Sequence, residues 1–395
     1  MSDVTRIRTL TSLVLIVLIA VAGTGSASGA HPPSPTEATE YARQWNLRAI
    51  HAETAWSEGE IGTPGVSVAV LDTGIDTEHP DLQGLVDLER STSLLTMSTR
   101  CPAGEPGIPS GTAEDATARS LGLPLVTDFH SHGTAVSGLI SSNAVVLAGV
   151  TQRTKLFGVK VHDRARRNCI SVYLEGVRYA ADNGADVIHL SFPLEFTRAQ
   201  FPATFDDMVA RVDATMDYAH RKGAVLVAAA GNASQEVGAD SDVFRFCVAR
   251  HVVCVSATGP GDPANVSPPA WDDPADYTNF GPAIDVAGPG GTGTFPNQVV
   301  PVWLHCSRVN LVATGAPAQC GTAPRLIWAS TGTSFGAAAT SGLIALLVDR
   351  IGKNRPDEVV AELIASADDL GPAGRDPYYG EGRISVANAV RAASP

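Results

Sequence analysis

From residue 66 onward, short apolar and β-branched runs alternate with longer segments of helical periodicity. The predicted strands are 66–71, 156–161, 185–192, 224–229 and 252–257, and the predicted helices are 171–183, 205–222, 335–351, 356–365 and 384–393. Strands that alternate with helices usually pair in parallel, and helices then cover both faces of the sheet. We therefore predict an α/β fold, a three-layer sandwich with a central, mostly parallel sheet and helices on both faces.

Two long segments interrupt this pattern, at residues 91–127 and 288–324, and both are predicted to be irregular loops. Loops of this length are usually functional or cross-linked. No linker divides the chain, so we predict one domain at 45–395, preceded by a short extension at 31–44. The Pro-rich start of that extension, 31–37, is expected to be disordered.

The first 30 residues have the pattern of an export signal. Arg6 and Arg8 precede an apolar run at 13–22, and Ser28 and Ala30 provide a cleavage pattern. The run is shorter than the roughly 20 residues that span a membrane, although an uncleaved anchor is the alternative. We therefore predict a signal peptide at 1–30 and a secreted or extracytoplasmic protein whose mature chain has no membrane span.

Six cysteines follow this signal, and an even number in an exported chain indicates disulfides. Six cysteines allow many pairings. Sequence proximity favours Cys247–Cys254 and Cys306–Cys320, which leaves Cys101–Cys169, and buried free thiols are the alternative. Because no Cys-x-x-Cys pair occurs, no metal site is predicted.

The net charge of −13 argues against a nucleic-acid partner, because proteins that bind nucleic acids normally carry a basic surface. A dinucleotide-binding function is suggested only by the glycine-rich run at 288–291. We discount it because no Gly-x-Gly-x-x-Gly segment opens a helix after the first strand.

Four polar residues in separate small-residue contexts together indicate nucleophilic catalysis. Asp72 follows the first strand, where α/β folds place functional groups. His132 and Ser334 each open a helix of small residues, so the two helices can pack closely. Asn232 follows the strand at 224–229 and can donate an N–H to an oxyanion. Each residue alone has an ordinary structural explanation, but together they supply a nucleophile, a base, an orienting carboxylate and an oxyanion donor.

Neighbouring residues have competing explanations. His130 lies two positions before His132 and is the local alternative for the base. Asp76, Asp81 and Asp87 are interpreted as turn or surface acids, or as calcium ligands.

The order Asp, His, Asn, Ser in these contexts resembles the subtilisin-like serine proteases (subtilases), and the resemblance extends from about residue 45 to residue 393. The matching segments are Asp72-Thr73-Gly74-Ile75-Asp76, His132-Gly133-Thr134, Ala229-Ala230-Gly231-Asn232 and Gly332-Thr333-Ser334.

The resemblance implies an exported serine endopeptidase with a polypeptide substrate. Ser334 would attack the peptide carbonyl, His132 would act as base and then acid, and Asp72 would orient His132. Asn232 and the Ser334 N–H would hold the oxyanion. The chemistry would need no cofactor. Structural calcium is common in the family, and the protein is expected to be a monomer.

The same resemblance implies that Leu190, Ser191 and Gly231 contact the substrate. The segment 233–246, which should complete the pocket for the residue before the scissile bond, differs too much from the family to be interpreted.

The sequence departs from the family pattern close to these motifs. Phe335, Ala338 and Ala339 stand where the family usually has Met and a Pro-His pair, and Ala135 replaces a common histidine. Pro193 stands where the substrate strand usually has glycine, and proline cannot donate a main-chain hydrogen bond. Only about a dozen residues follow the predicted cleavage site before the domain, so the pro-domain of secreted relatives is expected to be absent. These departures support the alternative of a catalytically silent relative that acts as a binding or scaffold protein.

Overall fold

The computed structural model describes residues 34–98, 101–105, 112–167, 169–191, 195–238, 242–262, 264, 270–293, 299–309, 320 and 326–392. The predicted signal peptide at 1–30 and Pro193 lie outside the described residues. Ser34–Pro395 forms one compact unit, so residues 34–44 belong to the same unit as the predicted domain.

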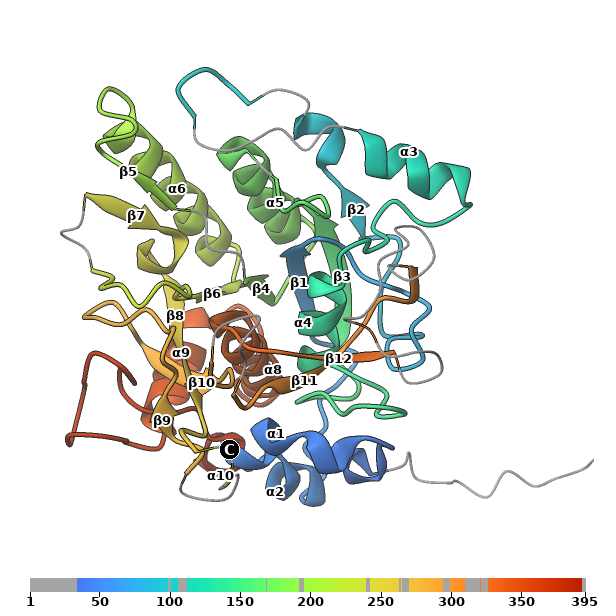
Figure 1. The fold of residues 1–395 in the computed structure, drawn as a ribbon, viewed down its shortest axis with the longest axis vertical. Helices are drawn as coiled ribbons and strands as arrows, with labels where there is room; N and C mark the ends of the chain where they lie inside the picture. The colour runs from blue at the N-terminus through green and yellow to red at the C-terminus, as the bar shows by residue number, and fades with distance from the viewer. Residues whose placement is uncertain are drawn as a thin grey trace, which may run out of the picture. The chain divides into compact units, whose positions relative to one another are not determined.

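A parallel sheet occupies the centre of this unit (Figure 1). Its strand order is β10-β8-β6-β4-β1-β3-β2, and β9 (Asp273–Pro274) adds an antiparallel edge to β8. The parallel strands are β1 (Ser67–Asp72), β2 (Thr92–Ser93), β3 (Lys155–Lys160), β4 (Val187–Leu190), β6 (Val225–Ala229), β8 (Val252–Gly259) and β10 (Val286–Pro289). The mostly parallel sheet was predicted from the alternation of elements and is confirmed.

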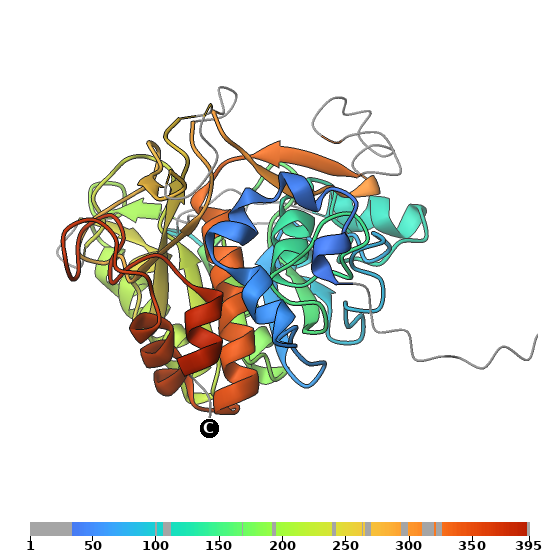
Figure 2. The ribbon, with the colours of Figure 1, turned by 90° about the horizontal axis from the view of Figure 1, so that it is seen from below.

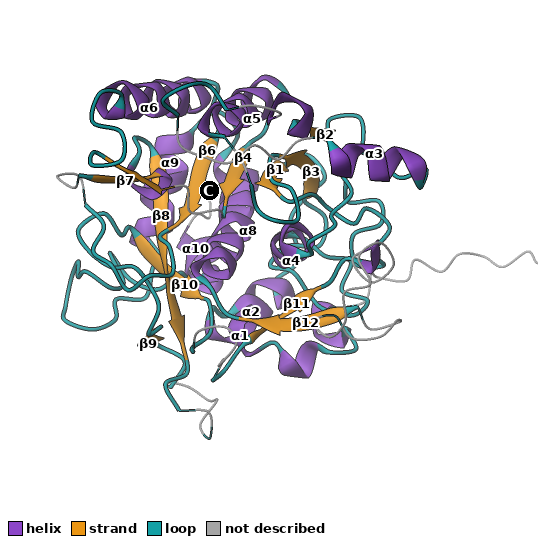
Figure 3. Ribbon diagram, turned by 45° about the horizontal axis from the view of Figure 1, so that its top comes forward, coloured by secondary structure: helices purple, strands orange, loops and turns teal. Residues whose placement is uncertain are grey.

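Two layers of helices enclose the sheet (Figure 3). Side chains of β1 alternate between them: Val68 and Val70 join the core beneath one layer, and Ala69 and Leu71 join the core beneath the other. The first layer contains α4 (His132–Ile140), α8 (Thr333–Ile351), α9 (Pro356–Ala365) and α10 (Val386–Ala392), and the second contains α5 (Ile170–Asp182) and α6 (Phe205–Arg221). The three-layer sandwich is therefore confirmed.

The N-terminal helices belong to the first layer. Figure 2 shows α1 (Trp45–Ala49) and α2 (Ala52–Ser57) beside the C-terminal helices, and α2 packs against α10. The indole N–H groups of Trp45 and Trp56 donate to the carbonyls of Pro301 and Val150. The expectation of disorder at 31–37 is wrong for Pro35–Glu37, which forms a short 3₁₀ helix, η1, because Pro35 is buried against the domain.

Helix α8 is buried along almost its whole length. Within the described ranges it is the one helix long and apolar enough to cross a membrane, but its buried position identifies it as the core helix of the sandwich. It begins at Thr333, two residues earlier than predicted, so Ser334 lies in its first turn.

The two segments predicted as irregular loops contain regular structure, which corrects that expectation. The first, 91–127, includes β2, a short 3₁₀ helix η3 (Leu95–Ser98) and α3 (Ala113–Ser120). Helix α3 is short and very polar, so it has little apolar periodicity to detect in sequence. The second includes β11 (Val302–His305), which pairs with β12 (Ile327–Ser330). A further antiparallel pair joins β5 (Glu195–Thr197) to β7 (Val243–Arg245), which is followed by η4 (Phe246–Val248).

The cysteines form Cys101–Cys169, Cys247–Cys254 and Cys306–Cys320, the pairing that sequence proximity favours. One disulfide thus joins the first long segment to the start of α5, and another lies within the second long segment.

Candidate active site

Asp72 is the last residue of β1 and is almost completely buried. Its Oδ1 accepts the Thr73 N–H at 2.7 Å and lies 2.8 Å from His132 Nδ1, and its Oδ2 accepts the Ser191 hydroxyl at 2.9 Å. Burial alone raises the pKa of Asp72, but the neighbouring His132 and the Thr73 N–H lower it more, so the net pKa lies well below the ordinary value.

An ionised Asp72 can only accept hydrogen bonds. His132 Nδ1 must therefore carry the proton, and Nε2 of the neutral ring is left with a lone pair. This is the tautomer that a general base requires.

His132 is brought to Asp72 by close backbone packing. Gly74, which has a φ of 120°, follows β1, and a Cβ added to Gly133 would lie 2.0 Å from the Gly74 carbonyl oxygen. The predicted close approach at Gly133 is therefore confirmed. Only glycine on the first turn of α4 allows the helix to begin against the end of β1.

The fully buried carboxylate of Asp128 organises the start of α4. It accepts the N–H groups of His130, Ser131 and Thr134 and the hydroxyls of Thr73 and Thr134. The Thr73 hydroxyl in turn accepts the Gly133 N–H at 3.0 Å. We did not predict this role. The N-cap position of α4 is Ser131, so Asp128 lies three residues before the position at which a capping residue is normally sought.

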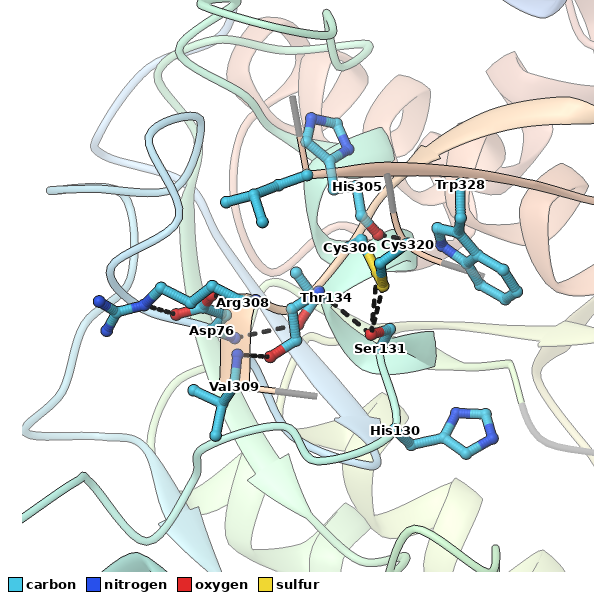
Figure 4. The surroundings of a disulfide bond; sticks show 12 residues. Asp76, His130, Ser131, Thr134, His305, Cys306, Arg308, Val309, Cys320 and Trp328 are labelled. Atoms are coloured by element: carbon cyan, nitrogen blue, oxygen red, sulfur yellow. Dashed lines mark hydrogen bonds and ion pairs between the residues drawn. A yellow bond between two sulfur atoms is a disulfide. The ribbon is translucent and has the colours of Figure 1, made fainter. Parts of the chain in front are cut away.

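The Cys306–Cys320 disulfide lies against the residue that precedes His132 (Figure 4). Ser131 Oγ is 3.3 Å from Cys306 Sγ and 3.7 Å from Cys320 Sγ, and it accepts the Ser307 N–H at 3.1 Å. The Ser307 hydroxyl donates to the Asp128 carbonyl at 2.7 Å. The segment after β11 therefore braces the turn from which His132 emerges.

Ser334 lies in the first turn of α8, is 5% exposed, and donates its hydroxyl to the Ser191 carbonyl at 2.8 Å. Ser191 thus contacts both the candidate orienting carboxylate through its side chain and the candidate nucleophile through its backbone. The Phe335 ring lies beside the His132 ring, with centroids 6.1 Å apart. The departure from the family at Phe335 therefore lies next to the candidate base.

Asn232 is held at the start of α8 by the residue before Ser334. Asn232 Oδ1 accepts both the Thr333 N–H and the Thr333 hydroxyl at 2.9 Å. Because the amide oxygen is occupied, the amide NH₂ is the end left to donate elsewhere. Asn232 is exposed, so a substrate can reach this group. The Thr333 hydroxyl also accepts the Gly231 N–H at 3.1 Å.

Gly231 adopts a φ of 107°, and a Cβ there would lie 2.4 Å from Asn279 Nδ2. Asn279 donates to the Ala230 carbonyl and accepts the N–H groups of Ala233 and Gln235. Asn279 therefore fixes the turn that carries Asn232, a role that we did not predict. Leu190 is fully buried at the end of β4.

The acids that were interpreted as turn or surface acids or as calcium ligands, Asp76, Asp81 and Asp87, all bond to other groups of the protein. Asp81 accepts three N–H groups, from Val145, Val146 and Leu147, and pairs with His305 at 3.1 Å. Asp76 pairs with Arg308, as Figure 4 shows, and Asp87 pairs with Arg90. Asp76 and Asp81 are buried, so neither is a surface acid. These contacts are typical of turn acids. Among the described residues, the Asp81 oxygens are engaged by backbone N–H groups and by His305.

Comparison with known proteins identifies the family. Residues 63–382 match the subtilase family. The thermophilic serine proteinase of a Bacillus species is 27% identical over 90% of this chain and 69% of its own length, and thermitase of Thermoactinomyces vulgaris is 24% identical over 91% and 99%. The epidermin leader peptide processing serine protease of Staphylococcus aureus has the same fold, with a TM-score of 0.68, 20% identity, and coverage of 90% of this chain and 82% of that one.

Proposed function

This chain belongs to the subtilase family and is a serine-type endopeptidase, and from that premise we propose that it works outside the cytoplasm through Asp72, His132, Ser334 and Asn232. The observation that carries this proposal is the chain of contacts from the Asp72 carboxylate to His132 Nδ1 on one side and through Ser191 to the Ser334 hydroxyl on the other. It brings three of the four residues into one buried network.

In the proposed reaction, His132 Nε2 accepts the Ser334 proton while the Ser334 oxygen attacks a peptide carbonyl. The hydroxyl must first leave the Ser191 carbonyl, which a change of the Ser334 side-chain rotamer would bring about. Asp72 keeps the histidine in the reactive tautomer and stabilises the imidazolium that forms. His132 then protonates the leaving amine. In the second half of the reaction His132 takes a proton from water as the water oxygen attacks the acyl carbonyl, and it returns that proton to the Ser334 oxygen as the ester bond breaks and the acid product leaves.

The developing oxyanion would be held by the Asn232 NH₂ and the Ser334 N–H. The Ser334 N–H is one of the unpaired donors of the first turn of α8, where the helix dipole favours negative charge. Leu190, Ser191 and Gly231 are proposed to position the substrate backbone. No cofactor takes part in this chemistry, and calcium, if bound, would act on stability alone.

The N-terminal sequence pattern supports export, and the three disulfides fit an oxidising compartment. The substrate is a polypeptide.

Labelling with a fluorophosphonate probe tests the proposal. We expect the secreted, oxidised protein to be labelled at Ser334, as located by peptide mapping, and the Ser334→Ala variant to remain unlabelled. Peptidase activity should fall by about 10⁶-fold in the same variant, a magnitude taken from subtilisin, a member of the same family. A folded wild-type protein that is not labelled would instead support the silent-relative alternative, with Phe335 and Ala338 as the first residues to examine.

A further inference from the structure

A group of metal-ligating side chains lies at the other end of the sheet from Ser334. His220 is in the last turn of α6, His251 precedes β8, and Asp357 is in the first turn of α9. One ligand atom from each lies within 4.8 Å of the other two. Three separate elements thus bring two imidazoles and one carboxylate together, and in the described part of the chain this is the one such group.

The contacts within this His220–His251–Asp357 cluster are close and oriented. The two imidazole rings stack with centroids 3.8 Å apart and planes 13° from parallel. His220 Nε2 is 2.8 Å from Asp357 Oδ1, and His251 Nε2 is 3.2 Å from Asp217 Oδ1. The stacked rings and the Asp357 carboxylate therefore place nitrogen and oxygen atoms from three elements side by side.

His251 is held in place by its backbone. It adopts the left-handed conformation, with a φ of 60°, inside the short loop that the Cys247–Cys254 disulfide closes. Non-glycine residues in this conformation are uncommon and are retained where the surrounding structure fixes them. The disulfide therefore presents His251 to His220 in a limited range of orientations.

The cluster has room for an ion and its water ligands. It lines an open pocket of about 310 Å³, whose other walls include Asp285 and apolar side chains of β6, β8 and α9. Asp217 and Asp213, which pair with Arg250, add acidic charge on the same side of α6. A divalent cation would find two nitrogens, one carboxylate oxygen and space for solvent.

We propose that His220, His251 and Asp357 bind a divalent first-row transition-metal ion, with Zn²⁺ as the best match. Imidazole nitrogens suit Zn²⁺, whereas Ca²⁺ and Mg²⁺ prefer sites made only of oxygen ligands. Tetrahedral Zn²⁺ with bonds of about 2.0–2.2 Å needs ligand atoms roughly 3.3 Å apart. The two stacked imidazoles must also turn out of their stack, because a metal bonds a ring nitrogen in the plane of the ring, and Asp357, which is 83% exposed, can follow His220 as it turns.

The position of the cluster assigns the ion a structural role. The central strands of the sheet are parallel. Asp72 is the last residue of β1, and Ser191 follows the last residue of β4, so both lie at the carboxyl ends of their strands. His220 and His251 instead flank the amino ends of β6 and β8. The ion would clamp α6, β8 and α9 together away from the proposed catalytic residues.

Zinc binding should be measured on the untagged, full-length chain carrying Ser334→Ala, so that autolysis and activity do not enter the result. Protein freed of metal by a chelator is titrated with ZnCl₂ by calorimetry, and the bound metal is counted after dialysis. Thermal unfolding is recorded with and without the ion, and CaCl₂ is the comparison salt.

His220→Asn and His251→Asn are the test variants. Asparagine tolerates the left-handed conformation, so His251→Asn removes the imidazole with little backbone cost. His51→Asn is the matched control, because His51 is an exposed histidine with a φ of 56° that is not in the cluster. Asp217→Asn keeps both imidazoles and removes the carboxylate that contacts His251 and Arg250.

We expect one Zn²⁺ per chain, a rise in melting temperature with ZnCl₂ and not with CaCl₂, and loss of both effects in His220→Asn and His251→Asn. His51→Asn should bind as the parent does, and Asp217→Asn should bind about 10–100-fold more weakly. Absence of stoichiometric binding, or binding that His220→Asn and His251→Asn leave intact, would overturn the proposal. Neither result would bear on labelling of Ser334.

Discussion

The two ends of the parallel sheet use the same side-chain chemistry in opposite ways. At the carboxyl ends of β1 and β4, Asp72 is 1% exposed and pairs with a histidine that is itself buried. At the amino ends of β6 and β8, Asp357 is 83% exposed and pairs with a histidine whose side chain is 17% exposed. We call these the carboxyl end and the amino end of the sheet.

The difference lies in what fixes each carboxylate. The Asp72 oxygens accept a backbone N–H and a hydroxyl in addition to the histidine, so the carboxylate has one position. The pairing of Asp357 with His220 at the surface is worth little on its own because water competes for both groups. An Asp–His pair is therefore a candidate catalytic pair when burial and further donors hold it in one geometry.

The largest expected effect comes from making the same substitution, Asp to Asn, at both ends of the sheet. Asp72→Asn should lower kcat by about 10⁴-fold, because an amide favours the wrong histidine tautomer, and this magnitude is that of triad aspartates in other serine proteases, subtilisin among them. Asp357→Asn should leave kcat unchanged. The measurement is hydrolysis of a peptide substrate by folded variants, and an Asp72→Asn enzyme with parental kcat would contradict the comparison.

Asn232 sharpens the comparison because it is exposed yet lies at the carboxyl end. Asn232→Ala should lower kcat by about 10²–10³-fold with little change in KM, a magnitude again taken from the equivalent loss in subtilisin. Melting temperature should also fall, because the fully buried Thr333 loses the amide oxygen that accepts its N–H and its hydroxyl. A large rise in KM at constant kcat would assign Asn232 to substrate binding in place of oxyanion stabilisation.

The disulfides offer a matched pair of deletions. Cys306–Cys320 contacts Ser131 next to His132, whereas Cys247–Cys254 closes the loop of His251. Removing both cysteines of either bond by serine substitution should cost about 2–3 kcal/mol of unfolding free energy.

Only the first deletion should also lower kcat, by up to about 10²-fold, because a small displacement of the base is costly. Chemical denaturation and steady-state kinetics on the two double variants give both quantities. Equal kcat values would show that the turn before His132 keeps its geometry without the bond.

The last prediction concerns the pH dependence of stability. Burial lowers the pKa of His162 and His189 to about 3 and that of His79 to about 4, and charges on Asp72 or Asp81 offset this only in part. Unfolding therefore takes up protons as pH falls below about 6.5, the ordinary histidine value. Stability should be full above that pH and should fall toward pH 4.

The slope should be at most about 1.4 kcal/mol per pH unit for each of these histidines. Burial raises the pKa values of Asp76 and Asp285. The native state therefore binds their protons more readily than the unfolded state does, and close to pH 4 these two residues make stability rise as the pH falls. Denaturant unfolding at a series of pH values measures the net effect, and His189→Asn should flatten the curve. A flat wild-type profile between pH 6.5 and 4 would contradict the assignment of neutral buried histidines.

Sequence alone determined the layers of the fold. The strand that ends at Asp72 and the helix that begins beside Ser334 were recognisable because buried parallel strands are continuously apolar and because small residues mark close helix packing. The motif order around Asp72, His132, Asn232 and Ser334 identified the family for the same local reason: each motif lies within a few adjacent residues.

Only the tertiary structure decided which hydrogen bonds support those motifs. Asp128, Thr333 and Asn279 hold the candidate site through hydrogen bonds that no sequence periodicity encodes. The same applies to His220, His251 and Asp357, which are far apart in the chain and show no ligand spacing. Side-chain contacts between separate elements depend on how strands and helices pack in three dimensions, and local sequence patterns carry no record of that packing.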